Sequence, residues 1–147
     1  MKFLRRNLIV AFTALVFNAL WEYVVCAYFY DNDIVFNMGE LMVEATFGDV
    51  GVTLLFFNIV LLLRKDKSWI FSVYDYFNVA VYGIAAAFYF DSIALNINRW
   101  AYSDAMLTIG NSGIGFMPVL QFAILIPFSI LIERMVSRFI EESRSTN

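Results

Sequence analysis

The sequence predicts an all-α integral membrane protein, a bundle of four transmembrane helices with both termini on the cytoplasmic side (N-in/C-in). Hydrophobic residues make up 61% of the 147 residues, and the mean hydropathy is +0.71. Charged residues make up 16%, whereas a typical soluble domain has about 25%. The charges lie between long apolar segments, which is the pattern of a chain that crosses a bilayer several times. We therefore expect a single transmembrane domain over residues 1–147.

Four apolar segments carry this prediction, at about residues 8–30, 41–63, 69–95 and 114–135. Each approaches or exceeds the ~20 residues that a helix needs to cross the hydrocarbon core. The first follows Lys2, Arg5 and Arg6, as the apolar region of a signal peptide would. It is longer than such a region, however, and has no cleavage site with small residues. We therefore take it as a span that the protein keeps.

The basic residues predict the orientation of these spans. In a four-span arrangement every Lys and Arg except Arg99 falls on one side of the membrane, and the positive-inside rule makes that side cytoplasmic. The residues on this side are Lys2, Arg5, Arg6, Arg64, Lys65, Lys67, Arg134, Arg138 and Arg144.

The composition excludes several classes of function. The net charge of −3 provides no basic face, so we expect no nucleic acid partner. The chain has no histidine, so we expect no metal and no cofactor, and acid–base chemistry would fall to carboxylates, Tyr or Lys. Cys26 is the only cysteine, which rules out a disulfide within the chain.

Polar residues gather in the predicted outer half of the membrane. An ionisable residue inside a span is costly and is by default a functional hypothesis. The inner half is mainly Leu, Val, Phe and Ile, with Asn58 and Asp75 as exceptions. Polar groups at one depth on every span predict a shared pocket open to the outer leaflet. Its expected members within the spans are Glu22, Glu44, Asp49, Asp91 and Gln121.

Three carboxylates are the candidates for a catalytic or proton-handling role. Asp49 is the deepest carboxylate of the second span and the strongest candidate, Glu22 shares a face with small residues of the first span, and Asp91 lies on a small-residue stripe of the third. A structural hydrogen bond between helices is the alternative for each of them. Glu44 and Asp49 are about 140° apart around an ideal helix, so one straight helix face cannot aim both into one pocket. Either the second span is buried on two sides, or the Gly48/Gly51 pair loosens it locally.

The predicted outer loop adds three ligand-binding candidates, Arg99, Trp100 and Tyr102. Arg99 is the only outer cation, and its planar guanidinium suits an anionic headgroup or a pairing with Asp49. Trp100 and Tyr102 have rings that settle at a membrane interface. Gln121, one turn inside the fourth span, can both donate and accept hydrogen bonds.

Several short motifs resemble those of known groups of proteins. Several motifs together resemble a group of small, uncharacterised four-span bacterial membrane proteins: Trp21-Glu-Tyr23, Gly48-Asp49, Arg99-Trp-Ala-Tyr102 and Gly115-Phe-Met-Pro-Val-Leu-Gln121. This resemblance implies a bacterial inner (cytoplasmic) membrane location and no particular activity.

A weaker resemblance is to the integral-membrane lycopene cyclase domain family. Asp91-Ser-Ile-Ala94, Trp100-Ala-Tyr102 and Gly115-Phe-Met-Pro118 are similar to motifs of that family. The family carries paired glutamates just after its proline, where this chain has Val119-Leu120-Gln121. The resemblance therefore implies the fold and a pocket for an apolar ligand.

These observations predict a polar pocket that binds an amphipathic or isoprenoid-like membrane lipid. One alternative is an enzyme in which a protonated carboxyl rearranges an isoprenoid or carotenoid. A second alternative is a small proton-coupled transporter that works as a homo-oligomer. A third is a scaffold subunit of a larger membrane complex, in which the carboxylates only hold helices together.

Overall fold

The computed structural model describes residues 2–31, 37–64 and 71–145. In this part of the chain, four long helices follow one another: α1 (Lys2–Val24), α2 (Met38–Leu63), α3 (Val73–Asn96) and α4 (Phe116–Ser145). A short 3₁₀ helix, η1 (Cys26–Tyr28), continues α1. All four long helices are long and apolar enough to cross a membrane, which confirms the predicted all-α class. Trp69, where the third predicted span begins, and Lys65 and Lys67 lie outside the described residues.

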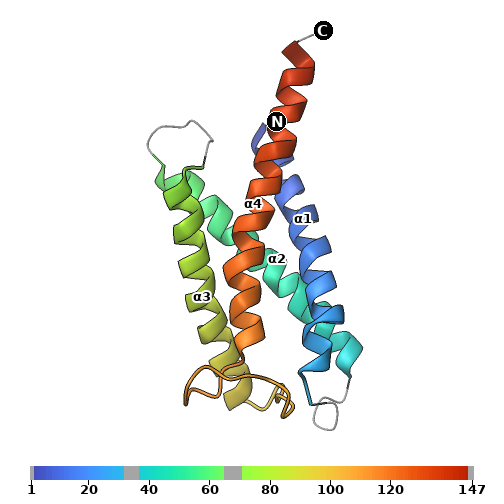
Figure 1. The fold of residues 1–147 in the computed structure, drawn as a ribbon. Coiled ribbons are helices and arrows are strands. Elements are labelled where there is room, and N and C mark those ends of the chain that lie inside the picture. The colour runs from blue at the N-terminus through green and yellow to red at the C-terminus, as the bar shows by residue number, and fades with distance from the viewer. Residues whose placement is uncertain (1, 32–36, 65–70, 146–147) are drawn as a thin grey trace.

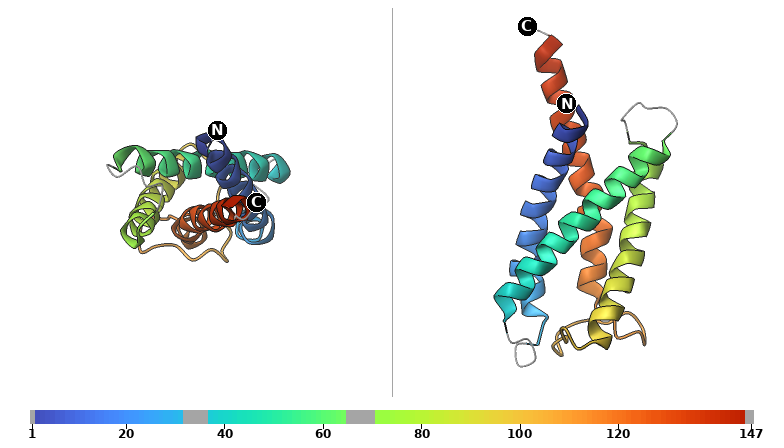
Figure 2. Two further views of the ribbon diagram at one scale, coloured as in Figure 1. Left: turned by 90° about the horizontal axis from the view of Figure 1, so that it is seen from above. Right: turned by 180° about the vertical axis from the view of Figure 1, so that it is seen from behind.

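The helices form one bundle with two distinct ends (Figure 1). α1 begins and α4 ends at the same end, which we call the terminal end, as the predicted four-span topology requires. Residues 97–115 lie at the opposite end, which we call the loop end. α4 packs between α1 and α3, while α2 crosses the bundle obliquely (Figure 2). It lies beside α1 at the loop end and beside α3 at the terminal end.

Polar caps begin two of the helices. The side chain of Asn37 accepts a hydrogen bond from the backbone N–H of Glu40 at the start of α2. Ser72 and Asp75 form a reciprocal capping box at the start of α3. Such a box satisfies backbone N–H groups that the helix cannot pair itself. Asp75, one of the two polar exceptions expected in the inner half, is thus a helix cap, and it also accepts a hydrogen bond from Arg64 at 2.5 Å.

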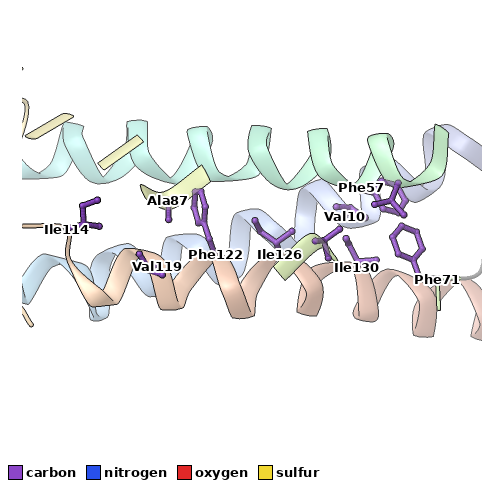
Figure 3. Packing of buried hydrophobic residues seen from close by; sticks show 11 residues of the cluster. Val10, Phe57, Phe71, Ala87, Ile114, Val119, Phe122, Ile126 and Ile130 are labelled. Carbon is purple, nitrogen blue, oxygen red and sulfur yellow. The ribbon is translucent and has the colours of Figure 1, made fainter. Parts of the chain in front are cut away.

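An apolar core runs along the centre of the bundle (Figure 3). Side chains from all four helices contribute to it, among them Val10, Phe57, Ala87 and Ile126. α3 and α4 approach each other closely at Gly83, where an added Cβ would lie 2.8 Å from a backbone oxygen of α4. Small residues allow such close approach of helices in lipid. The predicted small-residue stripe of the third span therefore faces a neighbouring helix.

The outer surface of the bundle is strongly apolar. Leu8, Phe12 and Phe47 expose 60%, 68% and 63% of their surface. Similar exposed apolar side chains include Leu62 of α2, Tyr89 of α3 and Phe139 of α4. A surface of this composition suits contact with hydrocarbon, in agreement with four helices of membrane-spanning length.

Candidate functional site

A cavity of about 200 Å³ lies between α2 and α3 in the loop-end half of the bundle. Its walls are apolar side chains of both helices, such as Val52 and Phe90. Pro118 and Phe122 of α4 lie behind them. Glu22 reaches the cavity from α1, so all four long helices contribute to its lining. We call this cavity the cleft.

Gln121 is the centre of the polar base of the cleft. Its Nε2 lies 2.6 Å from an oxygen of Asp49, 2.9 Å from Oε1 of Glu22 and 3.1 Å from Oδ1 of Asn18. Its Oε1 lies 3.8 Å from Sγ of Cys26. Asn18, Glu22 and Gln121 are each at most 3% exposed. The buried Gln121 amide therefore links α4 to α1 and α2 by hydrogen bonds.

This polar base has more acceptors than donors. A glutamine amide group carries two N–H donors, yet three oxygens lie within hydrogen-bond distance of it. Oε2 of Glu22 accepts no hydrogen bond from an N–H or O–H of the described residues, although it is buried. The carboxyl groups of Glu22 and Asp49 lie within hydrogen-bonding reach of each other. Two carboxyl groups can form such a bond only when one of them holds a proton.

Asp91 is the third carboxylate of the cleft, and it has its own donor. The Tyr102 hydroxyl donates to an oxygen of Asp91 at 2.5 Å. Burial, reinforced by the neighbouring Asp91, raises the pKa of the Tyr102 phenol above its ordinary value, so Tyr102 keeps its proton. Gly115 lies against Tyr102, where an added Cβ would be 2.9 Å from the ring. Tyr102 therefore contacts the site through its hydrogen bond to Asp91, and it does not line the cleft.

Arg99 pairs with Glu44, and not with Asp49 as one of the two expectations had it. Both side chains are about half exposed, at 48% and 52%, and both line the cleft. The pair is therefore at the edge of the cleft, whereas Asp49 is at its polar base. The backbone next to Arg99 is fixed, because its N–H bonds to the carbonyl of Ala94 and Asn98 takes a left-handed conformation with φ of 53°.

Glu44 and Asp49 both line the cleft, which agrees with the first of the two alternatives, a helix buried on two sides. α2 remains a regular helix through Gly48 and Gly51, so no local loosening is involved. Asp49 points toward α1 and α4, where it meets Gln121, and Glu44 points toward Arg99. The α2 residues that line the cleft therefore lie on more than one face of this helix, which crosses the bundle obliquely (Figure 1).

Aromatic rings cover the loop end of the cleft. Tyr30 stacks on Tyr102 with ring centroids 5.6 Å apart and meets Trp100 edge to face at 6.0 Å. Tyr30 and Tyr102 are also joined by an isolated antiparallel bridge. Tyr30 and Trp100 both line the cleft. Sequence reasoning selected Trp100 and Tyr102 but missed Tyr30, because nothing in the local pattern relates residue 30 to residue 102.

A second polar cluster, which sequence reasoning missed, lies in the terminal-end half. Arg6 donates through two nitrogens to both carboxylate oxygens of Glu133, each at 2.6 Å. Ser137 donates to the same carboxylate at 2.7 Å, and the Arg6 guanidinium lies 5.7 Å from the centre of the Phe57 ring. In the sequence, Arg6 is only one of the basic residues that predict the orientation of the spans. The position of Glu133 inside the predicted span 114–135 was the available signal.

The cleft and its surroundings bring together all eight residues proposed from the sequence. Seven of them line the cleft and Tyr102 contacts Asp91. Among the described residues, no group of three or more His, Cys, Asp or Glu side chains is arranged to hold a metal ion.

Comparison with known proteins provides no family for this chain: no protein-family model, no curated protein and no solved structure matches it.

Proposed function

We propose that the chain is a multi-pass membrane protein whose cleft binds the polar end of an amphipathic or isoprenoid-like lipid. In the orientation predicted from the basic residues, the cleft belongs to the outer leaflet of a bacterial inner membrane. The lipid tail leaves the cleft between α2 and α3 and continues along the apolar outer surface.

One observation carries this proposal: the cleft combines a buried polar base with apolar walls that continue to the surface of the bundle. Gln121, Glu22 and Asp49 form the base. Phe90, in the wall on α3, is 45% exposed and so extends from the cleft to the outside. Ligand sites typically combine apolar walls with a few polar groups that fix orientation. A cavity of this kind at hydrocarbon depth is accessible to lipids.

Mass spectrometry of lipid extracts from gently purified protein tests the proposal. We compare the wild type with Asp49→Asn, which alters the polar base, and with Ala45→Phe, which fills the cleft from α2. Glu40→Gln is the matched control, because it makes a comparable change on the same helix outside the cleft lining. A stoichiometric lipid present in the wild type and the control, and lost in both cleft variants, supports the proposal. Bulk phospholipid alone in all four folded proteins refutes it.

A second candidate is acid-catalysed rearrangement of an isoprenoid or carotenoid, which the Glu22–Asp49 carboxyl contact favours. A protonated carboxyl beside the apolar walls would protonate a carbon–carbon double bond, and a second carboxylate would stabilise the resulting cation. Production of the protein together with a carotenoid pathway tests this candidate. A pigment shift with the wild type that disappears with Glu22→Gln supports it, and unchanged pigments oppose it.

A further inference from the structure

We propose that the ligand of the cleft carries an organic ammonium group, held by Glu22, Asp49 and Asp91 and by the rings of Tyr30 and Trp100. This inference rests on the proposed function, since it names the polar end of the bound amphiphile. It follows from three properties of the cleft: its missing hydrogen-bond donors, its charge and its aromatic lining.

The first property is the shortage of donors at the polar base. Gln121 offers two N–H groups to three oxygens. No N–H or O–H of the described residues reaches Oε2 of the buried Glu22, so within the described residues only a shared carboxyl proton of Asp49 or the Cys26 thiol is left to donate to it. A buried acceptor without a donor costs about 1–3 kcal/mol. Glu22 is 3% exposed and lines the cleft. A ligand that brings N–H donors, or a positively charged group placed against this oxygen, would compensate it.

The second property is the net negative charge around the cleft. Glu22, Asp49 and Asp91 line it, while Arg99, the cation in its lining among the described residues, is already paired with Glu44. With one proton shared between Glu22 and Asp49, the three carboxyl groups still outnumber the cations of the lining that are free to balance them. An anionic headgroup would be repelled, and a cation would be attracted strongly because the cleft is partly shielded from water.

The third property is the presence of aromatic rings beside the carboxylates. Tyr30 and Trp100 line the loop end of the cleft and Phe90 lines its wall. The face of an aromatic ring attracts a cation, and aromatic rings are a common recognition element for quaternary ammonium groups. The adjoining apolar wall then accepts the carbon chain attached to the nitrogen.

Equilibrium binding of a radiolabelled dodecyltrimethylammonium probe tests the inference. The full chain is purified in a neutral maltoside detergent, and the probe is kept well below its own micelle concentration. The competitor is the neutral analogue in which a tert-butyl group replaces the trimethylammonium group, so that shape is kept and charge is removed. We expect saturable binding of the probe and at least about tenfold weaker competition by the neutral analogue.

Variants separate the contributions of the carboxylates and the rings. Asp49→Asn and Asp91→Asn are expected to weaken probe binding about tenfold or more, while Glu40→Gln binds like the wild type. Trp100→Leu is expected to weaken binding of the cation while leaving that of the neutral analogue unchanged, whereas Trp100→Phe retains most of the affinity. This second pair keeps the test valid if a carboxylate variant does not fold.

Each outcome bears on one of the two proposals. Equal binding of the probe and the neutral analogue at a saturable site would refute the ammonium group but not lipid binding. In that case a proton shared between carboxyl groups, and not a ligand cation, would supply the missing hydrogen-bond donor at the polar base. Unchanged probe binding in the carboxylate and Trp100→Leu variants would also refute it. The absence of saturable binding of either compound, together with no copurified lipid, would refute the proposed function as well.

Discussion

Removal of one partner of the Arg6–Glu133 pair should destabilise the bundle strongly. Arg6 and Glu133 are 6% and 0% exposed and form two hydrogen bonds of 2.6 Å. Glu133→Leu leaves a buried guanidinium without its counter-charge, and Arg6→Met leaves a buried carboxylate that keeps the hydrogen bond from Ser137 but loses its cation. Loss of one partner of a buried pair costs about 3–5 kcal/mol. We expect each single variant to lose this much free energy of unfolding.

The double variant Arg6→Met/Glu133→Leu should be much more stable than either single variant. Apolar side chains of similar size replace both charges, and such replacements of buried pairs are often neutral. The coupling free energy in the resulting double-mutant cycle is then at least about 3 kcal/mol. Reversible unfolding in mixed micelles with increasing dodecyl sulfate, followed by helicity and tryptophan fluorescence, measures the four free energies. Single variants within about 1 kcal/mol of the wild type, or a double variant as unstable as the sum of both, would refute this reasoning.

Two other predictions concern the packing and the site. Gly83→Ala should cost about 1–3 kcal/mol of unfolding free energy, because the new Cβ would lie 2.8 Å from the backbone oxygen of Phe122. The matched change Gly51→Ala meets nothing within 4 Å and should not destabilise the bundle. Equal thermal midpoints for the two variants would contradict the close approach of α3 and α4. Tyr102→Phe removes the hydroxyl that donates to Asp91 and should cost about 1–3 kcal/mol of unfolding free energy, while Asp91→Asn keeps an acceptor and should cost less. Unfolding in mixed micelles measures both variants, and a larger loss of free energy for Asp91→Asn than for Tyr102→Phe would contradict this order.

The sequence predicts the depth of the polar residues better than their partners. Hydropathy and charge place Glu22, Asp49, Asp91 and Gln121 at one level of the bundle, and the structure has all four lining one cleft. Depth follows from position along a helix, which the 1.5 Å rise per residue sets. The contact of Gln121 with both carboxylates depends instead on how the helices rotate against each other, which the periodic pattern leaves open.

Contacts between distant segments could not be predicted from local patterns. The Arg99–Glu44 pair depends on a loop held by the bridge between Tyr30 and Tyr102, whose partners are far apart in the chain. Arg6 looks like an interfacial charge because it follows Arg5 near the start of the chain. Only the packing of α1 against α4 buries it beside a carboxylate 127 residues away.

The oblique course of α2 means that a small tilt about its terminal end would move its loop end most. At the terminal end, Arg64 just after α2 is held by Asp75 at the start of α3, while the cleft lies along the first half of α2. With 26 residues, α2 is about 39 Å long, so a tilt of about 5° around this ion pair moves its first turn by about 3 Å. A motion this small would change the width between α2 and α3. The residence time of a bound molecule would therefore depend on an ion pair at the opposite end of the bundle.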